Sequence, residues 1–159
     1  MNIPTFEELH LLQDRLNEFK ENPKKIAKTI RIPEIITSVH DVPLDKFPSE
    51  KFLQLLADGA DINDKLPSGR TSMHLIAMMG CTPVLASLVK LGADMNVQEK
   101  LNGCTPLMEA IKAGHSEVAE WLVRNGARVD LISAYGIDAR KMASIHGLSS
   151  VIEAIDEVT

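Results

Sequence analysis

The sequence is poor in cysteine and in aromatic residues. Among 159 residues there are two cysteines, Cys81 and Cys104, and phenylalanine, tryptophan and tyrosine together make up 4%. The two cysteines form no Cys-x-x-Cys pair, so the sequence indicates neither a disulfide framework nor a cysteine-rich zinc site. We therefore expect the protein to work in a reducing compartment.

Long apolar runs are missing as well. Residues 1–20 carry acidic and polar side chains every few positions, whereas a signal peptide has a basic start followed by an apolar run. No stretch approaches the roughly 18 apolar residues that a membrane helix needs. The sequence predicts a cytoplasmic protein that does not bind membranes.

The chain also lacks an excess of positive charge. Lysine and arginine number 17 and aspartate and glutamate 22, which gives a net charge of −5. A generic nucleic-acid-binding surface is therefore not expected. The 45% of apolar residues is enough for the interior of one compact domain or one short repeat array, since domains usually have roughly 100 to 200 residues.

What the sequence does contain is a repeat. A glycine-centred segment occurs three times, as LADGADIN (56–63), VKLGADMN (89–96) and VRNGARVD (123–130). A second segment precedes the last two copies, as SGRTSMHLIAMMG (68–80) and NGCTPLMEAIKAG (102–114), and recurs in weaker form as YGIDARKMASIHG (135–147). The copies recur every 33 or 34 residues. A period of this length indicates a stack of short structural units.

Each unit predicts two short helices and a loop. A threonine can cap the start of the first helix, and a glycine can end it because glycine accepts the left-handed conformation. A second helix with an apolar stripe is expected over 83–91 and over 116–125, and turn-forming residues then fit a projecting, hairpin-like loop. The capping and ending residues are Thr71 and Gly80 in one unit and Thr105 and Gly114 in the next.

These residues resemble the ankyrin repeat. The resemblance is carried by Gly103, Thr105, Pro106, Leu107, Ala110, Gly114, His115, Glu117, Val118, Leu122, Gly126, Ala127 and Val129, and residues 69–96 repeat the pattern. It spans roughly residues 49–157 and implies an all-α solenoid of about three to four stacked repeats, the first of them incomplete. Residues 138–141 replace the usual Thr-Pro-Leu-His with Asp-Ala-Arg-Lys, as expected of a terminal repeat that faces water.

Residues 1–45 lie outside the resemblance, so we divide the chain into an N-terminal extension, 1–45, and an ankyrin array, 46–159. Thr5 and Glu8 have the spacing of a capping box ahead of an amphipathic run, which predicts a helix over about 5–21. The extension is expected to be helical and to cover the apolar end of the stack. Alternatively, it forms a basic docking patch, made of Lys24, Lys25, Lys28 and Arg31.

No catalytic, cofactor-binding or metal-binding site is predicted. His74 and His115 occupy positions where ankyrin repeats use histidine for helix capping and loop hydrogen bonds. Cys81 and His115 together offer too few ligands for a tetrahedral zinc site. An enzyme would need its site in the extension, where His40 beside Asp41 is the only candidate.

Asn63 and Asn96 follow Asp-Ile and Asp-Met. They resemble the asparagines that are hydroxylated in ankyrin repeats of animal cells. The simpler interpretation is that both are turn residues.

The resemblance implies a protein partner bound on a concave surface, formed by the loop tips and the outward side of the first helices. The residues placed there are Arg70, Met78, Met79, Leu101, Cys104, Lys112, Ala113, Tyr135, Ile137, Ile145 and His146. Adjacent methionines suggest an adaptable contact patch. Alternatively, the N-terminal helices fold over Met78 and Met79 and bury them.

The sequence therefore predicts a non-enzymatic protein-binding module without cofactor, and we expect it to be monomeric. Its partner could be an enzyme that it inhibits, as an immunity protein would. Scaffolding is a second role, and a third is that of a secreted bacterial effector acting inside a host cell. An enzyme with its site in the extension is the weaker alternative.

Overall fold

The structure is a computed structural model, and it describes residues 50–159. The N-terminal extension, with its expected helices and its basic patch, lies outside the described residues. No helix among residues 50–159 is both long and apolar enough to cross a membrane.

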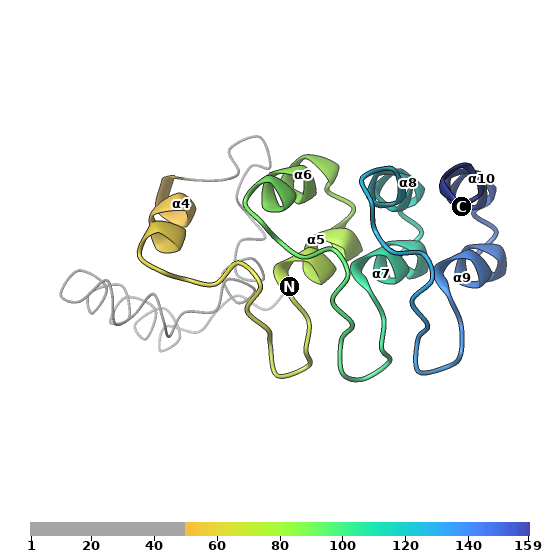
Figure 1. The fold of residues 1–159 in the computed structure, drawn as a ribbon, viewed down its shortest axis with the longest axis horizontal. Helices are drawn as coiled ribbons and strands as arrows, with labels where there is room; N and C mark the ends of the chain where they lie inside the picture. Colours follow the sequence, from red (N-terminus) through yellow and green to blue (C-terminus); the bar gives the residue numbers. More distant parts are fainter. Residues whose placement is uncertain (1–49) are drawn as a thin grey trace, which may run out of the picture.

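The described residues form helices joined by turns and loops, with no strand among them. The helices are α4 (Glu50–Ala57), α5 (Ser72–Met79), α6 (Thr82–Lys90), α7 (Pro106–Lys112), α8 (Ser116–Arg124), α9 (Ala139–Ile145) and α10 (Ser149–Val158). Figure 1 shows α5, α7 and α9 in one row, α6, α8 and α10 in a second row, and three loops that project beyond the first row. The predicted all-α solenoid is confirmed.

The residues that begin and end the helices act largely as the sequence predicts. Thr105 caps α7, where its Oγ1 accepts a hydrogen bond from the N–H of Met108 at 3.3 Å, and Pro106 takes the first helical position. Gly80 ends α5 in the left-handed conformation, with φ 75°. At the start of α5 a histidine takes part in the cap, because the N–H of Thr71 donates to Nδ1 of His74 at 3.1 Å.

The interior lies between the two rows. Of the predicted apolar stripe on α6, Val84, Leu85 and Leu88 are buried, and the stripe on α8 is buried over its whole length. Neighbouring first helices pack side by side, α5 on α7 and α7 on α9, and α8 packs on α7 and α10. One continuous core therefore runs through the stack, as a repeat array requires.

The loops are joined to one another by backbone hydrogen bonds. Lys100 N donates to Ser68 O at 2.9 Å, and Ala134 N donates to Asn102 O at 2.7 Å. Each bond links one projecting loop to the loop before it. The backbone thus sets the spacing of the loops along this edge of the molecule.

Two asparagines join the repeats at the turns that follow the second helices. Oδ1 of Asn63 accepts from Asp94 N at 2.7 Å, and its Nδ2 donates to Gly92 O at 3.2 Å. Oδ1 of Asn96 accepts from Arg128 N at 2.8 Å. Both asparagines lie in turns, so their interpretation as turn residues is confirmed, and each also connects two repeats.

Candidate protein-binding surface

We define the first-helix surface as the outward side of α5, α7 and α9 together with the three projecting loops. The last turns of the first helices bring six of the predicted contact residues to this surface, and the loops carry the others. From the helix ends come Met78, Met79, Lys112, Ala113, Ile145 and His146, all of them exposed. Their common position follows from the repeat, because each first helix ends at the same place in its unit.

Large apolar side chains are exposed on this surface. Leu101 and Tyr135 at the loops are 71% and 69% exposed, and Ile145 at the end of α9 is 60% exposed. Met78 and Met79 are 36% and 40% exposed. The sequence interpretation missed Ile132, which lies on the loop before α9 and is 59% exposed. It considered the tip of that loop and not the residues leading into it.

Cys104 does not reach the surface, so its placement there is wrong. Only 1% of the residue is exposed. It lies just before the cap of α7, where its backbone carbonyl meets Nε2 of His74 at 3.1 Å across the interface between repeats. Ile137 also turns inward, since it is half-buried and packs against the core.

A buried carboxylate connects the first-helix surface to the interior. Glu109 is 3% exposed, and its two oxygens pair with Nη2 of Arg70 at 3.2 Å and with Nζ of Lys112 at 3.3 Å. The side chains of Arg70 and Lys112 are 26% and 35% exposed. Two predicted contact residues are therefore held in place by an acid that the sequence interpretation did not single out, although the three-residue spacing of Glu109 and Lys112 on a helix is a signal of pairing.

A second carboxylate closes the middle loop. Glu99 is 2% exposed and accepts hydrogen bonds from the backbone N–H groups of Leu101 at 2.8 Å and Asn102 at 2.5 Å, and a longer one from Cys104 at 3.4 Å. Burial alone would raise the pKa of Glu99, but these backbone N–H groups, aided by the charge of Arg70, hold the pKa below its usual value. Glu99 is therefore ionised and fixes the shape of the loop.

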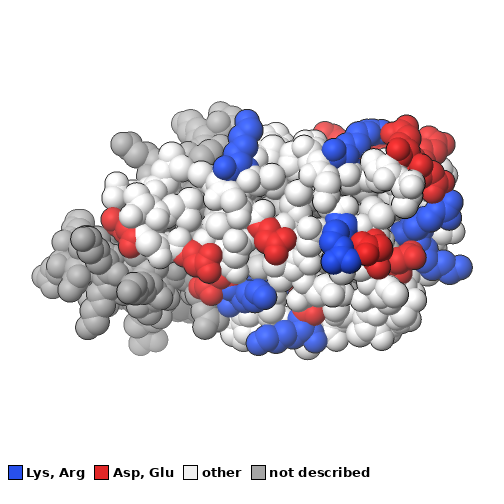
Figure 2. Space-filling view, in the orientation of Figure 1, with Lys and Arg blue, Asp and Glu red and all other residues white. Residues whose placement is uncertain are grey.

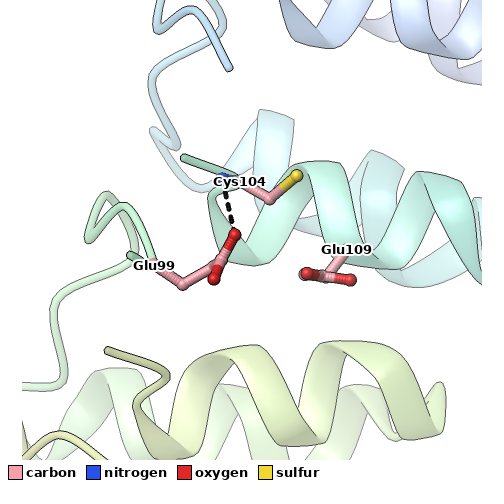
Figure 3. Close-up of side chains that lie close together, drawn as sticks. All are labelled: Glu99, Cys104 and Glu109. Atoms are coloured by element: carbon pink, nitrogen blue, oxygen red, sulfur yellow. Dashed lines mark hydrogen bonds between the residues drawn. The ribbon is translucent and has the colours of Figure 1, made fainter. Parts of the chain in front are cut away.

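Glu99, Cys104 and Glu109 lie close enough to suggest a metal centre (Figure 3). One ligand atom from each falls within 4.8 Å of the others. The donor set does not suit a cation, however, because the oxygens of Glu109 already pair with Arg70 and Lys112. Burial also raises the pKa of the Cys104 thiol, so a thiolate ligand is disfavoured. The cluster is a hydrogen-bonded support for the loop and for the surface above it.

The two central histidines have structural roles, as predicted. Nδ1 of His74 accepts from Thr71 N, so Nε2 carries the proton and donates to Cys104 O at 3.1 Å. Burial lowers the pKa of His74, which keeps the ring neutral. Nε2 of His115 lies 3.0 Å from Met78 O. Both rings are hydrogen-bonded to backbone groups of another repeat, an arrangement that joins repeats.

The stacked helix pairs, the left-handed glycines and the linked loops agree with the resemblance to the ankyrin repeat. The family model for ankyrin repeats, which describes three copies, matches residues 46–133. The chain belongs to the ankyrin-repeat family. Ankyrin repeats generally mediate protein–protein interaction and are not themselves catalytic.

Relatives within larger proteins share these ankyrin repeats. The chain is 33% identical over 94 residues to glycerophosphocholine phosphodiesterase gde1 of Schizosaccharomyces pombe, which covers 59% of this chain and 8% of that protein. It is 37% identical over 68 residues to the phosphate system positive regulatory protein PHO81 of Saccharomyces cerevisiae, covering 42% of this chain and 6% of that protein.

A human relative matches over a longer stretch. Ankyrin repeat domain-containing protein 63 of Homo sapiens is 30% identical over 110 residues, which is 66% of this chain and 29% of that protein. The chain thus spans a small part of the length of these relatives. What it shares with them is the repeat array.

Proposed function

We propose that this protein is a non-enzymatic binding module that holds a partner protein on its first-helix surface. The observation that carries the proposal is the exposure of Leu101, Tyr135, Ile145, Met78 and Met79 on one side of a stacked array. Exposed apolar side chains gathered on one surface are typical of interaction sites. Aromatic residues and methionine are also enriched in protein interfaces.

The support beneath this surface favours binding without rearrangement. Arg70 and Lys112 are held by Glu109, and the end of α5 is held by the bond between Met78 O and His115. Side chains that are already ordered lose less conformational entropy when a partner binds. The two methionines are flexible and polarisable, so they can adapt to the shape of the partner.

The names of the fungal relatives add no enzymatic function to this proposal. The match to the phosphodiesterase covers 8% of that protein and lies in the repeats. A role in which binding inhibits an enzyme, or brings two proteins together, is compatible with the surface. Each such role starts with the same contact, so the contact is what the first experiment must test.

The experiment replaces both methionines by glutamate. Met78→Glu combined with Met79→Glu should weaken binding of a partner, captured from cells of the source organism and then purified, by at least about 2 kcal/mol, because new charges would be buried without counter-ions. Isothermal titration calorimetry measures the affinity. Circular dichroism checks that the helices are retained.

The matched control places the same two charges at the start of a second helix. Ser149→Glu with Ser150→Glu alters two exposed residues of α10, in the second row, and should change the affinity by less than about 0.5 kcal/mol. If the methionine variant keeps its helices and binds as tightly as the unmodified protein, the partner does not use this surface.

A further inference from the structure

Charge is distributed unevenly between the two rows of helices. The first helices α5, α7 and α9 contain one acidic residue, Glu109, and it is buried. The second helices α8 and α10 carry most of the exposed acids of the described helices, and Figure 2 shows acidic side chains gathered over α8 and α10 at the upper right. These exposed acids are Glu117, Glu153, Asp156 and Glu157.

Glu99, Glu109, Arg70 and Lys112 form an ionic cluster under the first-helix surface, and their charges add up to zero. The two carboxylates are buried more deeply than the two cationic groups. The carboxylates of Glu99 and Glu109 are 2% and 3% exposed. The cationic side chains of Arg70 and Lys112 are 26% and 35% exposed. A partner that approaches this surface therefore meets the two cations first, with both carboxylates beneath them.

The cations have donors left over. A guanidinium group has five N–H donors and an ammonium group three. Arg70 uses Nη2 on one oxygen of Glu109, whereas Lys112 uses Nζ on the other oxygen and, at 3.9 Å, on Sγ of Cys104, which leaves it one donor. The Nε of Arg70 is buried and has no acceptor among the described residues. The remaining guanidinium donors and that of Lys112 can take a further carboxylate, and charge-assisted bonds of this kind are the stronger class.

Apolar side chains are exposed at the ends of α5 and α7, near Lys112 in the sequence or at the matching place of the preceding repeat. Lys112 lies two residues before Gly114, as Met78 lies two residues before Gly80 in the preceding repeat, and the two helices pack side by side. Met78 and Met79 are exposed at the end of α5, and Ala113 is exposed directly after Lys112. A ligand that combines a negative charge with apolar groups fits both features.

We propose that the partner presents an acidic segment to this surface: an aspartate or glutamate side chain binds Arg70 and Lys112, and apolar residues beside it pack on Met78 and Met79. This inference rests on the proposed function, since it names the chemistry of the segment that the module binds. A basic segment would meet like charges, which disfavour association.

The test uses the full chain as bait for a library of random peptides displayed on phage. We expect the selected peptides to be enriched in aspartate or glutamate next to apolar residues. A synthetic copy of the most enriched peptide then serves as the probe, and fluorescence anisotropy measures its affinity. Lys112→Gln and Arg70→Gln should each weaken binding about tenfold through loss of a charge-assisted bond.

The matched control is Lys90→Gln, the same change at an exposed lysine of α6 in the second row, and it should leave the affinity unchanged. The unmodified chain provides a measurement that does not depend on any variant folding. Its affinity for the peptide should fall as sodium chloride is raised, because salt screens exposed charges.

The outcomes separate this inference from the proposed function. If the selected peptides are neutral or basic, and their binding is lost in the Met78→Glu, Met79→Glu variant but kept in Lys112→Gln, the proposal of an acidic segment is wrong and the proposed binding surface is supported. Peptides that bind both variants normally overturn the surface itself. Affinity that does not change with salt overturns the acidic segment, and failure to select any peptide counts against both proposals.

Discussion

The middle repeat, α7 and α8, and the last repeat, α9 and α10, follow the same chain path with different residues at matching places. The second residue of α7 is Leu107, which is fully buried in the core. The second residue of α9 is Arg140, which is exposed and bonds Asp156 at 2.8 Å. A repeat with a neighbour on both sides needs an apolar residue there, and a repeat at the end of the stack needs one that water accepts.

A second contrast, between the α5–α6 repeat and the middle repeat, appears at the glycines that follow their first helices. A methyl group added at Gly80 would lie 2.7 Å from Nδ1 of His115, whereas at Gly114 it would meet nothing within 4 Å. Both glycines have positive φ, 75° and 77°. Backbone conformation therefore requires glycine at both places, and lack of space requires it only at Gly80.

The largest effect is expected where the two repeats differ most in burial. Leu107→Ala should lower the free energy of unfolding by about 2 to 5 kcal/mol, because it leaves a cavity in the core. Arg140→Ala, at the matching place in the last repeat, should cost less than about 1 kcal/mol because it removes an exposed ion pair. Urea denaturation followed by circular dichroism measures both, and equal losses would contradict the comparison.

A smaller difference is expected at the two glycines. Gly114→Ala should cost about 1 to 2 kcal/mol, because an L-residue is forced into the left-handed conformation. Gly80→Ala should cost at least about 1 kcal/mol more, because the added methyl group also crowds the ring of His115. Chemical denaturation of the two variants side by side tests this order, and a larger loss at Gly114 would show that the interface is not filled as described.

A further effect is absent at neutral pH and appears only on acidification, and it concerns the α5–α7 interface, where His74 joins two repeats through Cys104 O. Burial lowers the pKa of folded His74 below 6.5. The unfolded chain therefore takes up a proton as the pH falls below about 6.5 while the folded protein does not, so stability is lost in that direction, by at most about 1.4 kcal/mol per pH unit. Above about pH 6.5 the ring is neutral in both states and no stability is lost.

The variant His74→Gln isolates this contribution, because glutamine at this helix position can still accept from the N–H of Thr71 but does not titrate. Thermal melting of both proteins between pH 7.5 and pH 5 gives the difference in stability, in which the other ionisable groups cancel. The unmodified protein should lose more stability on acidification than the variant. A parallel decline would mean that the folded ring is protonated as easily as the unfolded one.

Much of the fold follows from the sequence, because the decisive residues are local. Thr105, Pro106 and Gly114 set the ends of α7 whatever packs against it, and the spacing of these residues repeats along the chain. The apolar stripes on α6 and α8 could be predicted for the same reason. Stacking then follows, because so short a pair of helices cannot bury its apolar face alone.

The site could be predicted only in part. The exposed methionines and the loop residues Leu101 and Tyr135 follow from their place in the repeat, and the burial of Cys104 does not. The sequence interpretation also missed Glu109 as an organiser of the surface. Its carboxylate is paired with Lys112 on the same helix and also with Arg70, which comes to it from another repeat, 39 residues earlier in the chain. No local pattern encodes the meeting with Arg70.

The backbone hydrogen bonds between the loops affect which mutations the loops can accept during evolution. Lys100 N and Ala134 N donate to backbone carbonyl groups. These hydrogen bonds therefore do not depend on the chemistry of either side chain. Only proline, which lacks an N–H group, is excluded from both positions. Point mutations at the loop tips can therefore alter what the protein recognises while the arrangement of the loops is kept.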